Sequence, residues 1–124
     1  MNPNYQQLIE QAYHAFNARD INAVLLLMSP DVKWPNGWEG GYVNGHNEVR
    51  DYWTRQWKEI DPTVKPVSFN SKTEGQLEVE VEQIAKDVNG NVLFEGIVYH
   101  TYTFEKGVIK SMEIATLQAI QPLL

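Results

Sequence analysis

The first part of the chain carries apolar residues at helical spacing. Between Tyr5 and Phe16 they recur every three or four positions, which places them on one face of a helix. Asn2 followed by Pro3 offers a cap and a first turn for that helix. His14 points away from the apolar face and is expected to be solvated.

Two further helices and a short strand are expected next. The second helix has Asp20 as its N-cap and continues to Met28, and it should be buried because it is apolar nearly all round. A strand at 32–34 and a turn-rich stretch follow it. The third helix is expected from about His46 to Ile60, where an Asp-Pro pair stops it.

The second half of the chain changes to a period of two, which is typical of strands. From 77 to 83 apolar residues alternate with glutamates, so one face is buried and the other is wet. Asn89-Gly90 predicts a two-residue type I′ turn, and counting outward from it places Val79 opposite His100. His100 and Tyr102 therefore share the buried face.

The turn at 105–107 leaves two registers open. A three-residue loop, with its glycine in the left-handed conformation, places Met112 opposite His100. A two-residue turn made by its lysine and glycine places Glu113 there instead and creates an acid–imidazole pair. The first register is favoured because lysine is poorly suited to a positive φ and because the second would bury Glu113.

The order of these elements predicts the fold class. A strand from Val64 to Phe69, interrupted by Pro66, is expected at a sheet edge. Helices followed by a meander of long strands indicate an α+β domain, with the helices on one face of a curved antiparallel sheet.

Composition limits the partners. The 124 residues, 43% of them apolar and 21% charged, have ordinary globular composition and fit one domain over 1–124. The net charge of −6 has the wrong sign for nucleic acid, and the lack of cysteine fits a reducing, cytoplasmic compartment. No window approaches the roughly 20 apolar residues of a membrane span, so no membrane partner is expected.

Residues 8–20, the segment Ser29-Pro30-Asp31-Val32-Lys33-Trp34, the helix after Gly45 and the terminal meander together resemble a known superfamily. It is the nuclear transport factor 2-like superfamily, in particular its SnoaL-like and ketosteroid-isomerase-like members, and the resemblance covers about residues 5–117. It implies a cone-shaped curved sheet wrapped by three N-terminal helices around a pocket. Members include isomerases, cyclases, epoxide hydrolases and dehydratases, and they are commonly dimers.

The resemblance also allows a test of one mechanism. Similar ketosteroid isomerases use a tyrosine on the first helix, a general-base aspartate after the first strand and a protonated aspartate on a late strand. The matching positions here are Ala12, with Tyr13 one residue away, then Asn36 and His100. Because Asn36 cannot take up a proton at neutral pH, the steroid isomerase mechanism is not supported.

His100 is the candidate acid–base residue, because a histidine on an apolar strand face changes protonation near neutrality. The other interpretation is a core histidine satisfied by Tyr102 or a backbone carbonyl. Gln83, expected to point inward opposite Gly96, is a candidate for orienting a carbonyl or hydroxyl. The candidate ligand-binding residues are Tyr13, Phe16, Trp34, Asn36, Trp38, Trp53, Gln83, Tyr102 and Met112.

The four tryptophans fall into two pairs. Trp53 and Trp57 have the helical spacing of residues that pack a helix on a sheet. Trp34 and Trp38 flank a Pro-Asn-Gly turn at the expected mouth of the cone, so they are the better pocket candidates. Asn36, between them, is first of all a turn former.

No metal and no cofactor is expected. His14, His46 and His100 lie on three different elements. His46 and Glu48 are two positions apart and so do not face each other on a helix, and Glu48 and Asp51 are acids of an N-terminal turn, where the helix dipole stabilises negative charge.

Two functions remain open. The first is a small-molecule pocket protein, an isomerase, cyclase, dehydratase or hydrolase acting on an apolar oxygenated substrate, with His100 as its acid–base group. The second is a non-catalytic ligand-binding or assembly module, which the lack of any predicted inward carboxylate favours. A homodimer is expected through the outer sheet face, where Glu78, Glu80 and Glu82 lie beside Tyr99 and Ile97.

Overall fold

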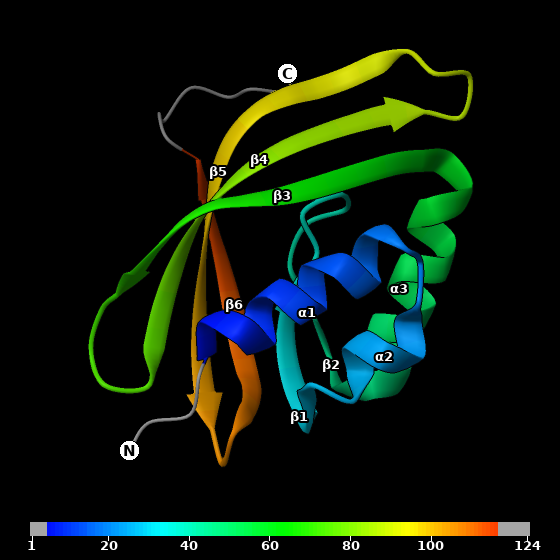
Figure 1. The fold of residues 1–124 in the computed structure, drawn as a ribbon. Coiled ribbons are helices and arrows are strands. Elements are labelled where there is room, and N and C mark those ends of the chain that lie inside the picture. Colours follow the sequence, from blue (N-terminus) through cyan, green and yellow to red (C-terminus); the bar gives the residue numbers. More distant parts are fainter. Residues whose placement is uncertain (1–4, 117–124) are drawn as a thin grey trace.

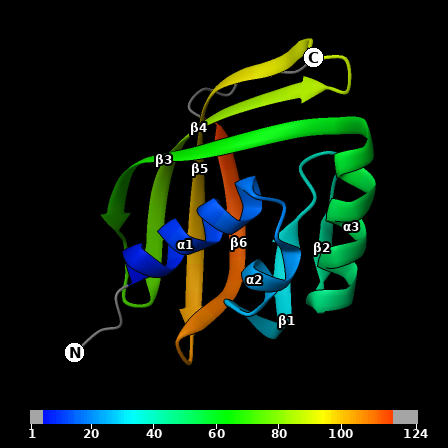
Figure 2. The same cartoon turned by 45° about the vertical axis from the view of Figure 1, so that its right-hand side comes forward.

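The protein is a curved sheet with three helices on its concave side. The computed structural model describes residues 5–116. Its six strands follow the order β2-β1-β6-β5-β4-β3. Figures 1 and 2 show β3, β4 and β5 bending over the helices, with α1 lying across the hollow of the sheet and α3 beside β1 and β2. The elements are α1 (Tyr5–Asn17), α2 (Ile21–Leu25), β1 (Met28–Pro35), β2 (Tyr42–Asn44), α3 (Gly45–Glu59), β3 (Ile60–Ser71), β4 (Gln76–Asp87), β5 (Val92–Glu105) and β6 (Val108–Thr116).

This architecture confirms the predicted fold class and adds one feature to it. β1 pairs with β6 in parallel, so the sheet is mixed, whereas the other strand pairs within residues 5–116 are antiparallel as expected. β3 lies at the sheet edge, as Pro66 predicted, although the strand is longer than the 64–69 segment. The short strand β2 was not predicted from the sequence.

The helix predictions hold except at their ends. Asp20 caps α2, since its carboxylate accepts the Ala23 amide at 3.2 Å. α2 ends before Met28, which begins β1 instead, and Leu26 is 79% exposed, so the expectation of burial all round was wrong. The cap expected for α1 at positions 2–3 lies outside the described residues. No helix within residues 5–116 is both long and apolar enough to span a lipid bilayer.

The predicted register of β4 and β5 is confirmed along their central part. Val79 lies opposite His100 and Gln83 opposite Gly96. The turn that joins the strands differs from the prediction: Gly90 is the one turn residue with a positive φ, whereas a type I′ turn needs two. The loop is three residues long, and a bulge at the start of β5, where Leu93 has no partner on β4, restores the predicted pairing.

Neither predicted register of β5 and β6 is right. The turn at 106–107 has two residues, both with positive φ of 56° and 83°, although lysine seldom adopts this conformation. A bulge near the start of β6, where Lys110 has no partner on β5, then shifts the pairing, so that Ile114 lies opposite His100. Met112 stays buried on the inner face and Glu113 is exposed, as expected, even though the register itself differs.

Burial of apolar side chains holds the helices on the sheet. Ile9 on α1, Val49 on α3, and Val32, Val79 and Ile109 on three strands have no exposed surface. Each such side chain contributes roughly 1.5–3 kcal/mol relative to its exposed state. Their burial holds α1 and α3 against the sheet, between which the site described next lies.

The outer face of the same strands is polar along β4. Glu78, Glu80 and Glu82 pair with Thr101, Tyr99 and Ile97, as the sequence predicted. The homodimer expected through this face stays a prediction.

Candidate functional site

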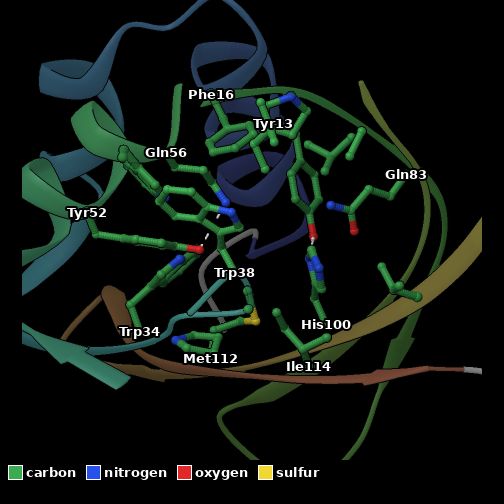
Figure 3. A pocket seen from close by; sticks show the side chains of 18 of the residues that line it. Tyr13, Phe16, Trp34, Trp38, Tyr52, Gln56, Gln83, His100, Met112 and Ile114 are labelled. Carbon is green, nitrogen blue, oxygen red and sulfur yellow. Dashed lines mark hydrogen bonds between the residues drawn. The ribbon is translucent and has the colours of Figure 1, made fainter. Parts of the chain in front are cut away.

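A cavity of about 550 Å³ lies between the concave face of the sheet and helices α1 and α3 (Figure 3). Its lining within the described residues contains no Asp, Glu, Lys or Arg, in agreement with the expected lack of inward carboxylates. Most of the wall is aromatic or aliphatic, which suits a flat apolar ligand. The candidate residues that line it are Tyr13, Phe16, Trp34, Trp38, Trp53, Gln83, His100, Tyr102 and Met112.

The aromatic part of the wall is built around Trp53. Its ring lies edge-on to Trp34, with centroids 5.7 Å apart, and edge-on to Phe16 at 5.3 Å. Trp57 stacks against Trp53 at 5.7 Å and is not part of the lining. The packing role therefore describes Trp57, whereas Trp53 both packs the helix and lines the cavity.

Three side chains form a buried chain of hydrogen bonds beside the cavity. The Tyr102 hydroxyl donates to the Tyr13 hydroxyl at 2.9 Å, and the Tyr13 oxygen lies 2.8 Å from Nδ1 of His100. Figure 3 shows Tyr13 extending from α1 toward the imidazole. Since Tyr13 accepts from Tyr102 and has one proton of its own, we assign that proton to the hydrogen bond with Nδ1. The neutral imidazole of His100 then carries its own proton on Nε2.

Burial keeps this chain uncharged at neutral pH. It lowers the pKa of His100 to about 4, and His100 has no acidic partner among the described residues to oppose that effect. Burial also raises the pKa of Tyr102, and it raises that of Tyr13, where the neighbouring Tyr102 adds to the effect. His100 is thus partnered by Tyr13, not by Tyr102 or a backbone carbonyl as the core interpretation expected, and it also lines a cavity.

Gln83 adds a polar group to the same side of the cavity. It lies on β4, and its amide points toward Tyr13 (Figure 3). No hydrogen bond holds this amide within residues 5–116. It can therefore offer both a donor and an acceptor to a ligand.

Two polar residues of α3 that the sequence did not single out also line the cavity. Nε2 of Gln56 donates to the Tyr52 hydroxyl at 3.1 Å, and both side chains are buried. They lie four positions apart and so share a helix face with Trp53. A glutamine on the same face as buried aromatics was the signal available in the sequence.

Asn36 does not line the cavity, which corrects the expectation of a ligand contact. Its Oδ1 accepts the amides of Trp38 at 3.2 Å and Glu39 at 2.7 Å, and its Nδ2 donates to Glu39. Arg55 in turn donates to both carboxylate oxygens of Glu39, at 2.9 and 2.7 Å. Asn36 therefore shapes the 36–41 loop, which carries Trp38 to the cavity.

The acidic and histidine residues at the start of α3 are engaged elsewhere. His46 Nε2 lies 3.0 Å from the Met28 carbonyl oxygen, and Glu48 accepts the Asn44 amide at 2.7 Å. Asp51 accepts from Arg55 within the helix. Within residues 5–116, no three or more His, Cys, Asp or Glu residues are grouped so that they could hold a metal ion.

Three solved structures show how widely this fold is shared. An NTF2-like protein of unknown function from Burkholderia pseudomallei is 25% identical, with a TM-score of 0.81 over 93% of this chain and 92% of that one. TerC co-crystallised with polyporic acid is 23% identical, with a TM-score of 0.78 over 89% and 88%. RV0760c from Mycobacterium tuberculosis, in complex with estradiol-17β-hemisuccinate, is 19% identical, with a TM-score of 0.76 over 88% and 90%.

The sequence comparison gives the family. No curated protein is similar enough to count as a relative. Further matched structures, which carry the provisional name polyketide cyclase, share the fold at 18% and 17% identity. The model of the SnoaL-like domain matches residues 9–112, and the chain therefore belongs to the SnoaL-like family within the nuclear transport factor 2-like superfamily.

Proposed function

We propose that the cavity binds a flat apolar molecule bearing a carbonyl or hydroxyl oxygen, and that Nε2 of His100 donates a hydrogen bond to this oxygen. The observation that carries the proposal is the Tyr102–Tyr13–His100 chain, which ends at an uncharged, mostly aromatic cavity. The ligands of two matched structures, polyporic acid and estradiol-17β-hemisuccinate, support it as multi-ring molecules that carry oxygen.

The chain of hydroxyls makes His100 a better donor than an isolated imidazole. Because Tyr13 donates to Nδ1, it draws electron density from the ring and strengthens the Nε2–H donor. A neutral imidazole of this kind polarises a carbonyl and stabilises the negative charge that develops on its oxygen. In enolisation the α C–H bond breaks, the proton passes to water, and the electron pair moves toward the oxygen held by His100.

This chemistry fits a cofactor-free cyclisation or isomerisation. His100 is the group that would act on the substrate, with Tyr13 and Gln83 orienting the imidazole and the bound oxygen. Among residues 5–116 the lining has no carboxylate to serve as a separate general base, so the proposed reaction depends on polarisation of the carbonyl. That same observation favours the second candidate function, a protein that binds the ligand without transforming it.

The binding proposal is tested with 9-fluorenone and fluorene, which share a skeleton and differ in the carbonyl. Quenching of the cavity tryptophans reports binding. We expect about tenfold tighter binding of fluorenone, and we expect His100→Leu to abolish that preference while fluorene still binds. A preference that survives in His100→Leu would contradict the contact.

Catalysis is tested separately from binding. NMR in deuterated buffer follows exchange of the α protons of 2-tetralone. Exchange that wild type accelerates and His100→Leu does not would support a catalytic role. Binding without acceleration would leave the non-catalytic function.

A further inference from the structure

The Tyr52 hydroxyl is a polar group of the cavity that His100 chemistry does not use. Tyr52 is 3% exposed and lies on α3, whereas His100 lies on β5. Figure 3 shows the two side chains on opposite sides of the cavity, with Trp34 and Trp38 drawn near the Tyr52 side. The cavity therefore has a second polar position.

Hydrogen-bond donors surround the Tyr52 oxygen. Gln56 Nε2 donates to it at 3.1 Å. Burial raises the pKa of Tyr52 to about 12, and the nearby backbone amides of Trp38 and Gly37 partly oppose that rise. No carbonyl or carboxylate within residues 5–116 accepts the proton of this hydroxyl. The hydroxyl is a donor without an acceptor, and the space beside it is the cavity.

We propose that Tyr52 donates its hydroxyl proton to a second oxygen of the ligand, so that the natural ligand is a flat aromatic molecule with oxygens at two opposite positions. The first oxygen faces His100 and the second accepts from Tyr52, while Gln56 positions the Tyr52 hydroxyl. This inference rests on the proposed function, because it presumes that the first oxygen is bound by His100. Tyr52 remains a donor throughout the neutral pH range, since its phenol stays protonated.

Two matched probe series test the second oxygen. One comprises biphenyl, 4-hydroxybiphenyl and 4,4′-dihydroxybiphenyl, and the other comprises anthrone and 9,10-anthraquinone. Dissociation constants are measured by tryptophan quenching for wild type, Tyr52→Phe and Tyr42→Phe. Tyr42 is the matched control, because its hydroxyl donates to Glu113 on the exposed surface, away from the cavity.

In at least one series, the second oxygen should tighten binding to wild type by about threefold to tenfold. Tyr52→Phe should lose this gain while binding fluorene and the one-oxygen probes as wild type does, and Tyr42→Phe should keep it. The proposal is overturned if the second oxygen adds nothing in both series, or if Tyr52→Phe weakens one- and two-oxygen probes equally.

A second variant keeps the tyrosine and changes only its neighbour. Gln56→Glu replaces the amide donor with a carboxylate that accepts the Tyr52 proton, so the gain from the second oxygen should disappear although the hydroxyl is present. Retention of the full gain in this variant would argue against Tyr52 as the donor. If wild type instead binds fluorenone no more tightly than fluorene, the His100 contact is refuted. The failure of the proposed function is thus distinguished from the failure of this inference.

Discussion

The concave face of the sheet has a filled end and a hollow end, and one strand passes through both. At the filled end, Phe104 of β5 stacks on Tyr5 of α1 with ring centroids 3.9 Å apart. At the hollow end, Val98 and His100 of the same strand line the cavity. All three β5 residues alternate inward in the same way. The side chains of β5 thus point inward at both ends, and the two ends differ in the elements that cover them.

Helix α1 causes this difference. Its first turns, with Tyr5 and Ile9, cover the filled end closely, whereas Tyr13 and Phe16 near its C-terminus line the cavity. At the hollow end, the covering elements α1 and α3 leave about 550 Å³ between them and the sheet. Stability should therefore depend mainly on the filled end, and ligand binding on the hollow end.

The largest effect is expected from Ile9→Ala at the filled end. Ile9 has no exposed surface, so the truncation creates a cavity in the core and should lower the free energy of unfolding by about 2–5 kcal/mol. Urea unfolding measures it. Trp38→Ala is the matched truncation at the hollow end, where Trp38 is 37% exposed, and it should cost less than about 1 kcal/mol while weakening ligand binding. Equal losses in the two variants would refute the division into two ends.

The next effect tests whether the hollow end excludes water around His100. Its pKa of about 4 in the folded protein is below the ordinary 6.5, so the unfolded chain binds the proton more tightly. The free energy of unfolding therefore has its full value above pH 6.5, where His100 is neutral in both states. It falls as the pH is lowered from 6.5 through 4, by about 3 kcal/mol in total.

His100→Gln isolates that pH dependence. Its neutral side chain does not titrate, so the difference in unfolding free energy between wild type and this variant should change steadily between pH 6.5 and 4, in favour of the variant at low pH. Measuring the difference removes the contribution of carboxylates with lowered pKa, such as Asp31, Glu39 and Asp87. A difference that does not change with pH would mean that His100 is well hydrated.

Periodicity predicted which residues point inward, because alternation on a strand is a local property. It placed Gln83, His100 and Tyr102 correctly on the inner face. Periodicity did not distinguish an inward side chain that packs against another side chain from one that lines the cavity, since this difference depends on how α1 covers the sheet. Tyr52 was missed for the same reason, because beside Trp53 it has the spacing of an ordinary packing residue.

The errors in the hairpins have a different cause. The Lys106 conformation is unfavourable by itself, but pairing along the whole of β5 and β6 outweighs that local cost. The bulges then shift each register by one residue without exchanging the faces set by hydrophobic burial. Asn36 was misassigned because its side chain bonds to Glu39 within the folded loop, and hydrophobic periodicity carries no information on the conformation of a loop.

The smallest effect on stability is expected at the mouth of the hollow end. Arg55 holds Glu39 and, through it, the loop that carries Trp38. Both charged side chains are 43% exposed, so Arg55→Ala should cost less than about 1 kcal/mol in urea unfolding. Ligand dissociation, followed by stopped-flow tryptophan fluorescence, should nevertheless become a few-fold faster, because Trp38 loses its anchor.

Arg50→Ala is the matched control for the mouth. This exposed arginine lies on the same helix and contacts Asn22 at 2.6 Å, away from the 36–41 loop. Its removal should leave the dissociation rate unchanged. If both variants release ligand equally fast, the effect comes from loss of charge on α3, and the loop does not control the cavity. If only Arg55→Ala releases ligand faster, a surface ion pair that contributes little to stability controls access to the hollow end. The filled end differs, because there the same contacts both cover the sheet and stabilise the fold.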